Sequence, residues 1–384
     1  MKRKKTGRRW RCLWVLALLF CLSLPVSAEE GMLPEMPEEY GAVRDHLPED
    51  VVQALPEGMM SEDLEEQGQA LEEMLSPAYW LSMLSQMLER ALGGGLASFA
   101  TLCGLLLLAA VLRTLQSSLS SEGLGRAVHF CSTGAIFASL LHLQYTQLEA
   151  VAQFFERLHA LMLAMIPVGG TVLAMGGNVS TAAANTATMS FFLTVSETLC
   201  AKSVVPVTTA CTSLILCRSL SPDSGLGGLH NAIRKVYTFV LGFVMTLMTT
   251  LLSTQTTLCA AADSTGARAA RLVSSTVIPI VGGAVGDTLR TVATGVQYLK
   301  SVVGIGGILF LALLVLPTLL SLLVTRLMLL LSGGVAEMLG CEQESRLLSE
   351  LGGVWGIMIA VVAMTSVMFL LALAILVRVT VAAA

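Results

Sequence analysis

Two pairs of oppositely charged residues stand beside apolar runs of the sequence. Glu197 and Lys202 flank the end of one run, while Asp287 and Arg290 lie three positions apart, so that they can pair on one face of a helix. Burying such groups in a membrane is costly unless they are paired. They are therefore candidate intramembrane charges of a gate or an ion path. The sequence leaves an alternative open, in which all four lie at the membrane–water boundary.

A proline followed by two glycines occurs twice in apolar surroundings, as IPVGG and as IPIVGG. The residues concerned are Pro167, Gly169 and Gly170 in the first copy and Pro279, Gly282 and Gly283 in the second. Proline removes a helix hydrogen bond and glycine relaxes the backbone, so both copies are predicted to break a helix. Paired broken helices are typical of transporter binding sites. Pro and Gly also ease close packing between membrane helices, and this second interpretation stays open.

Residues 276–290 are predicted to form a broken or re-entrant element that faces protein, with Asp287 and Arg290 at the water boundary. Broken backbone at membrane depth is tolerated only inside protein or beside water. Residues 177–190 contain mostly small side chains, which favour tight helix packing or, alternatively, a polar pore lining. Arg268, Arg271 and Lys300 are expected to be solvated flanks of this region rather than ligands.

Motifs that would indicate an enzyme or a metal protein do not occur in the sequence. It has no Walker A lysine loop, no HExxH and no GxSxG, and its nine cysteines form no CxxC pair. We therefore predict no catalytic residues, no cofactor and no metal site.

The elements that position these residues must lie in a membrane. The 384 residues are 54% hydrophobic and only 13% charged, whereas soluble domains carry about 25% charged residues. A chain this apolar cannot cover a water-facing surface. Its class is therefore an integral membrane protein.

The N-terminal part carries an export signal followed by an acidic segment. Residues 1–28 combine a basic start, an apolar run of about a dozen residues that is too short to span, and a small-residue cleavage site. Residues 29–95 hold 16 Asp and Glu against two basic residues, which excludes a nucleic-acid binder. Leu64, Leu71, Met74 and Leu75 fall on one face of an expected helix from Ser61. This segment needs a partner or the membrane surface to pack on.

The rest of the sequence predicts an all-α fold, a polytopic helical membrane protein with a small acidic helical extracytoplasmic N-terminal segment. Spans are expected at 96–116, 127–148, 158–176, 180–217 (two segments that meet near Lys202 and Pro206), 236–258, 302–331 and 354–377. The predicted domains are the signal peptide 1–28, the acidic segment 29–95, a first transmembrane group 96–260, an amphipathic or re-entrant motif region 261–300, and C-terminal transmembrane helices 301–384.

Loop charges give a prediction for the orientation. Basic residues near 113–126 and 218–235 predict that both turns are cytoplasmic. Residues 259–300 would then lie outside, although they too are basic, unless 272–286 dips back into the membrane or crosses it. The topology of this half stays open at this stage.

Three stretches together resemble one known family. They are the acidic LPED…LPEG segment with IPVGG, the stretch ARAARLVSSTVIPIVGGAVGDTLRTVATGVQYLKSVVGIGGIL at 267–309, and LVTRLMLLLSGGVAEMLG at 323–340. In these features the chain resembles the stage III sporulation protein AE family of endospore-forming bacteria. The resemblance covers nearly the whole mature chain, and the stretch 267–309 is its most specific part.

The resemblance implies a non-enzymatic, multi-pass protein of the mother-cell membrane that surrounds the forespore. It implies a component of a secretion-like channel, working with other membrane proteins of the stage III sporulation complex and a forespore membrane protein, with a homo-oligomer as one arrangement. No catalytic residues are carried over. The alternative function is a secondary transporter or permease with its site between the two Pro/Gly segments. The acidic exported helices favour partners over a self-contained transporter.

Overall fold

The structure of this chain is a computed structural model. It describes the backbone of residues 49–52, 64–117, 122–176, 179–220, 228–251 and 282–378, together with Thr254 and a few residues between 55 and 61. Side chains of residues 49–50, 64, 115–117, 122–130, 132–133, 220, 282–293 and 375–378 are not described. The predicted signal peptide, residues 29–48 of the acidic segment and most of residues 252–281 therefore lie outside the described residues.

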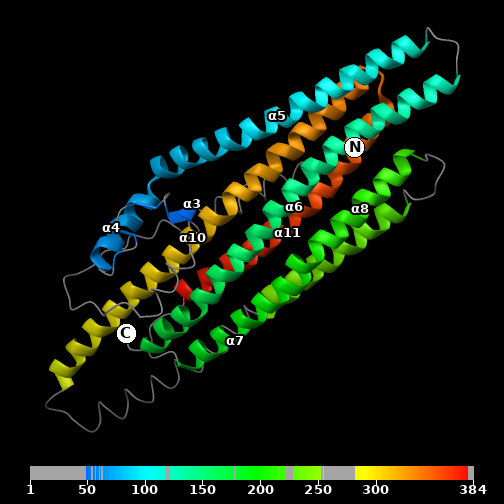
Figure 1. Cartoon of the computed structure of the whole chain (residues 1–384). Helices are drawn as coiled ribbons and strands as arrows, with labels where there is room; N and C mark the ends of the chain where they lie inside the picture. The colour runs from blue at the N-terminus through cyan, green and yellow to red at the C-terminus, as the bar shows by residue number, and fades with distance from the viewer. Residues whose placement is uncertain are drawn as a thin grey trace, which may run out of the picture.

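Every regular element in the described part of the chain is a helix, which confirms the all-α prediction there. The helices are α3 (Glu49–Val52), α4 (Leu64–Leu75), α5 (Pro77–Ser117), α6 (Glu122–Met175), α7 (Val179–Ser196), the π-helix η1 (Glu197–Ala201), α8 (Lys202–Leu220), the helix Gly228–Leu251, α10 (Gly282–Met338) and α11 (Glu342–Arg378). Figure 1 shows them as an elongated bundle of nearly parallel rods.

Six helical runs within the described ranges are long and apolar enough to cross a membrane, as expected for a multi-pass protein. They are Pro77–Thr114, Gly134–Met175, Val179–Ser219, Gly228–Leu251, Thr294–Met338 and Glu342–Ala374. Consecutive runs alternate in direction along the bundle (Figure 1). Arg113 lies at the end of the first run and Arg218 at the end of the third, so the turns that follow them share one end of the bundle. The positive-inside rule predicts that this end is cytoplasmic.

These helices are much longer than a bilayer is thick. α6 has 54 residues and α10 has 57, or about 80 and 85 Å at about 1.5 Å per residue. A bilayer core needs only about 20 residues, or about 30 Å. The bundle must therefore extend out of the hydrocarbon.

Two ion pairs lie at the end of the bundle where α10 turns into α11. Arg113 of α5 donates to both carboxylate oxygens of Glu344, at 3.2 and 3.1 Å, and to the carbonyl of Gly340, at 3.1 Å. Arg218 of α8 pairs with Glu350, two turns further along α11. Burial raises the pKa of the Cys341 thiol in this turn, and the charge of Glu344 raises it further. We call this level the inner boundary.

The opposite boundary follows from the length of the charge-free runs. α5 carries no charge between Arg90 and Arg113, which is 22 residues or about 33 Å. On α11, Thr365 lies beside Cys200 of η1 and is 21 positions from Glu344, or about 32 Å. Arg90 and η1 therefore lie at about the same level of the bundle, and we call this level the outer boundary.

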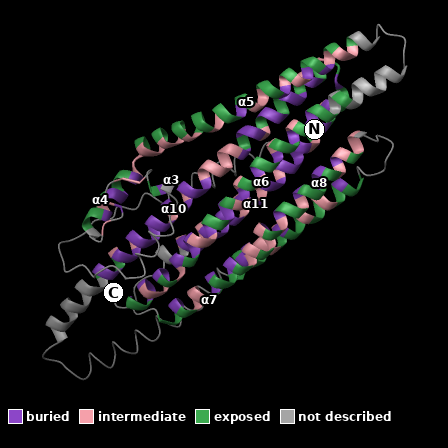
Figure 2. Ribbon diagram, viewed as in Figure 1, coloured by how far each residue is buried: buried purple, intermediate pink, exposed green. Residues whose placement is uncertain are grey.

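Beyond the outer boundary the bundle continues as an apolar extension made by residues 160–175 of α6, α7 and the first half of α10. Gly307 of α10 lets the helices pack closely there. A Cβ atom at this position would lie 2.5 Å from Met165 Cε of α6 and 3.5 Å from Leu373 Cδ2 of α11. Figure 2 shows how buried positions follow the inner faces of α10 and α11, while the outer faces are exposed. We use the name extracytoplasmic extension for this part.

The acidic segment packs on this extension. Leu71 and Met74 of α4 are buried, as the predicted face requires, and Met59 is buried with them. α4 rests on α10 at Gly68, where a Cβ atom would come 2.1 Å from the Tyr298 hydroxyl oxygen. The partner that this segment needed is therefore, at least in part, α10 of the same chain.

Two expected breaks do not occur. Spans at 127–148 and 158–176 were predicted as separate helices, but α6 runs through both because Val151, Phe154 and Phe155 keep the charged stretch between them packed and helical. The interruption predicted at Pro167 was also wrong, since α6 continues to Met175. Membrane helices tolerate proline where neighbouring helices pack on both sides.

The predicted junction near Lys202 lies at the correct place, but the chain does not turn back there. α7, η1 and α8 follow one another in a single rod. The predicted domain boundaries at 95 and 300 remain predictions, and α5 and α10 each cross one of them without a break.

Candidate functional site

The charged residues Glu197 and Lys202 meet at the π-helix η1. Lys202 Nζ lies 2.8 Å from Glu197 Oε1, and His159 Nδ1 of α6 lies 4.0 Å from Glu197 Oε2. Residues five apart on an α-helix point about 140° away from each other. The wider π-turn, with its i→i+5 hydrogen bonds, brings Glu197 and Lys202 onto the same side, and such turns are frequent at functional sites.

Small side chains in the extracytoplasmic extension fix the register that places His159 opposite Glu197. Gly170 of α6 faces Thr186 of α7, and a Cβ atom at position 170 would lie 2.8 Å from Thr186 Oγ1. His159 and Glu197 are each eleven residues further along these two antiparallel helices. The run 177–190 therefore contributes tight helix packing at Thr186, which is one of the two functions predicted for it.

The group formed by His159, Glu197 and Lys202 lies at the outer boundary and faces outward. The exposed fractions of the three side chains are 40%, 41% and 66%. A charged group this exposed cannot face hydrocarbon, so it faces water, lipid headgroups or another protein. Whether Glu197 and Lys202 lie at the membrane–water boundary stays a prediction. The arrangement offers an ion pair with an adjacent imidazole, which suits recognition rather than catalysis.

The two Pro/Gly motifs do not come together. In the first, Pro167 is exposed and Gly169 is buried within α6. In the second, Gly282 and Gly283 start α10, and Pro279 lies outside the described residues. Because Gly307 is level with Met165, Gly282 lies about 30 Å further along the bundle than Gly170. A single site between the two motifs has no support in this geometry.

Asp287 and Arg290 lie in the first turns of α10, beyond the extracytoplasmic end of the membrane band. Their side chains are not described, so their pairing stays a prediction. The part of 276–290 that is described, from Gly282 onward, is helical. The re-entrant part of that prediction falls mainly on residues outside the described ranges.

One expectation about charge was wrong. Lys300 was predicted to be a solvated flank, but it is 1% exposed in α10, and its Nζ has no hydrogen-bond partner among the described residues. Val296, Leu299 and Val303 around it are buried at helical spacing, which is the signal that would have indicated a core position. His159 was also missed, since a lone histidine gives no pattern in the sequence.

Long apolar helices with paired charges at both ends of a bilayer-thick band define a polytopic α-helical membrane protein. The chain belongs to the stage III sporulation protein AE family, whose family model matches residues 60–380. It is therefore a multi-pass membrane protein of a sporulation family.

A curated relative supports the same assignment. The chain is 23% identical over 234 residues to stage III sporulation protein AE of Bacillus subtilis (strain 168), which is 61% of this chain and 58% of that protein. The match thus spans somewhat more than half of the relative's length. No solved structure matches the chain.

Proposed function

We propose that this chain is a non-enzymatic component of a secretion-like channel complex between the mother cell and the forespore, and that sporulation requires it. Its location would be the mother-cell membrane around the forespore. Its partners would be other membrane proteins of the stage III sporulation complex and a forespore membrane protein. Membership of a sporulation family supports the cellular role.

The observation that carries the proposal is the extracytoplasmic extension. Large apolar side chains on its α6–α7 hairpin are exposed, namely Leu163, Met175, Val179 and Phe191, and the proposal takes them to lie outside the hydrocarbon. Exposed apolar surface outside the hydrocarbon is typical of protein–protein contacts. A rigid projection of this kind suits a protein that must contact partners in the space between two membranes.

Single substitutions on that hairpin test the proposal. Leu163→Glu and Phe191→Glu should leave the chain inserted in the membrane but abolish its co-purification with the other stage III membrane proteins from sporulating cells, and spore yield should fall. Ser85→Glu, at an exposed polar residue of α5 beyond the same boundary, is the control and should behave like the wild type. Normal co-purification and normal spore yield for both hairpin variants would refute the proposal.

The transporter alternative rested on two broken helices that enclose one site. α6 is continuous through its motif, and the two motifs are far apart along the bundle. Coupled uptake of a small solute by the purified chain alone in vesicles would nevertheless decide for the transporter, since a complex component should show none.

A further inference from the structure

One exposed face of α6 is polar along most of the middle of the helix. His142, Thr146, Glu149, Gln153 and Glu156 are all exposed. They follow one another at steps of three and four residues, so their side chains leave the helix within an arc of about 80°. We call this surface the polar face of α6.

Contacts with α11 fix the level of the polar face within the bundle. Gln144 accepts a hydrogen bond from Nε1 of Trp355. Further along α6, Met165 lies together with Leu373 of α11 against Gly307. Between these two contacts α11 carries no charged residue. The polar face is therefore level with the apolar stretch with which α11 can cross a membrane.

At the same level, α10 presents a large apolar side chain to its surroundings. The guanidinium group of Arg326 lies on α11, where a Cβ atom at Gly356 would be 3.3 Å from its Nη1. Leu323, about one turn nearer the extracytoplasmic extension, is exposed. It is level with Glu149 to within about 5 Å.

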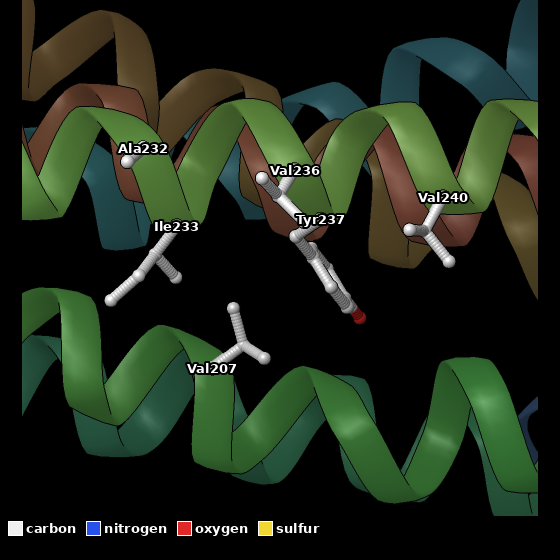
Figure 3. Close-up of a pocket in the computed structure, with 6 residues that line it drawn as sticks. All are labelled: Val207, Ala232, Ile233, Val236, Tyr237 and Val240. Carbon is white, nitrogen blue, oxygen red and sulfur yellow. The ribbon is translucent and has the colours of Figure 1, made fainter.

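The helix Gly228–Leu251 is apolar at this level as well. Arg234 contacts α11 at Gly353, and the exposed Phe243, nine residues further on, is again level with Glu149 to within about 5 Å. An open groove between this helix and α8 has an almost wholly apolar lining (Figure 3), formed by Val207, Ala232, Ile233, Val236, Tyr237 and Val240. These surfaces suit contact with lipid chains, and the polar face of α6 does not.

The charges of the polar face decide what it contacts. Carboxylates are unfavourable against lipid chains, so the face must meet water or polar groups of protein. Copies of the chain insert in one orientation, so in a closed ring Glu149 of each copy faces Glu149 of the others across the axis. Dry contact would set these like charges against one another in a low dielectric. Water between the copies removes this repulsion.

We propose that several copies of this chain surround a water-filled conduit lined by the polar face of α6, and that its ring of Glu149 carboxylates favours the passage of cations. Carboxylate rings are a common source of cation preference in channels. No basic residue occurs within four positions of Glu149, whereas Arg157 directly follows Glu156. Leu141 lies about 80° from Glu149 around α6, on the flank toward lipid. The inference rests on the proposed channel function and names the surface that conducts.

Water access at matched levels is the first test. Thr146→Cys and Gln153→Cys probe the polar face, and Leu323→Cys and Phe243→Cys probe the apolar faces. Membranes of sporulating cells that produce the full chain are treated with a small, cationic, water-soluble methanethiosulfonate, and the reaction is measured as the gain over the wild type. The two α6 positions should react about tenfold faster than the two controls, because a thiol in water ionises to the reactive thiolate.

The charge of the reagent tests the role of Glu149. At Thr146→Cys the cationic reagent should react faster than its anionic counterpart, and adding Glu149→Gln should lower this ratio about fivefold. Glu72→Gln removes an exposed carboxylate of α4 and should leave the ratio unchanged. Two differently tagged copies of the chain, produced in the same cells, should also co-purify in mild detergent.

Four results would overturn the proposal. Slow reaction at both α6 positions indicates a dry contact, and equal reaction at all four positions places this level in bulk water. Separate purification of the two tagged copies indicates that a different protein closes the conduit. An unchanged reagent ratio in Glu149→Gln removes the cation preference. None of these results alters the co-purification with other stage III proteins that tests the proposed function, so the two can fail separately.

Discussion

Gly95 of α5 lies so close to Val324 of α10 that a Cβ atom at position 95 would be 2.6 Å from Val324 Cγ1 and 3.3 Å from Met328 Cγ. The two helices run in parallel through the membrane band, and this contact is where their surfaces approach. Small residues at such points let helices pack closely in a bilayer, where no hydrophobic force drives them together. The neighbouring Gly94 is exposed, with nothing near its Cβ position.

This contact predicts that Gly95→Leu separates α5 from α10, whereas Gly94→Leu does not. Both variants gain similar helix propensity, about 0.8 kcal/mol, so the difference between them reports packing alone. Forcing a large side chain into a close contact costs about 1–3 kcal/mol. Thermal unfolding of the two variants in one detergent should show Gly95→Leu as the less stable. Equal midpoints would mean that α5 does not pack on α10 there.

The position of the membrane band predicts different water access for two exposed leucines of α6. Leu141 lies between the two boundaries. Leu163 lies about 33 Å further along α6 than Leu141, beyond the outer boundary. With the purified protein in nanodiscs, a water-soluble maleimide should label Leu163→Cys quickly and Leu141→Cys hardly at all. Labelling of both, or of Leu141→Cys alone, would place the bilayer elsewhere along the bundle.

The ion pair at the inner boundary predicts a loss of stability on neutralisation. The Glu344 side chain is fully buried and accepts two hydrogen bonds from Arg113, whose side chain is 30% exposed. Glu344→Gln should destabilise the bundle by about 2 kcal/mol, less than for a fully buried pair because Arg113 can reach water. Glu342→Gln, at an exposed position in the same turn, provides the control for unfolding in detergent. A double-mutant cycle with Arg113→Gln should then give a coupling energy well above zero.

Composition and spacing were sufficient for the class of fold and for the buried face of α4 with Leu71 and Met74. They failed where long-range packing overrides a local signal. Pro167 and the charged stretch before His159 both read as interruptions, yet contacts of Phe154, Phe155 and Gly170 with neighbouring helices keep α6 continuous. The contacts of α11 with Arg218 of α8, Arg234 of the helix Gly228–Leu251 and Arg326 of α10 could not be predicted either. No spacing along the chain relates residues that only the fold brings together.

The full length of the helices was also not predicted. Searching for runs of about 20 apolar residues divides the chain into bilayer-sized pieces. The structure instead has helices of up to 57 residues in which the membrane band is only one part. The apolar residues 160–175 looked like a span because their composition resembles one. They form the last part of the apolar run Gly134–Met175 of α6, which contacts α10 at Gly307 and α7 at Gly170.

The two motif prolines give a final prediction, because they are expected to differ in function despite their similar sequence. Pro167 is exposed within a continuous helix, so Pro167→Ala should restore a helix hydrogen bond and leave sporulation unchanged. Pro279→Ala and Asp287→Asn change the motif 276–290, which carries the most specific family resemblance, and should lower spore yield while the protein still inserts in the membrane. Spore counts and membrane fractionation of the three variants decide the matter. Wild-type spore yield in Pro279→Ala and Asp287→Asn would remove the functional role assigned to this motif, since insertion alone does not need it.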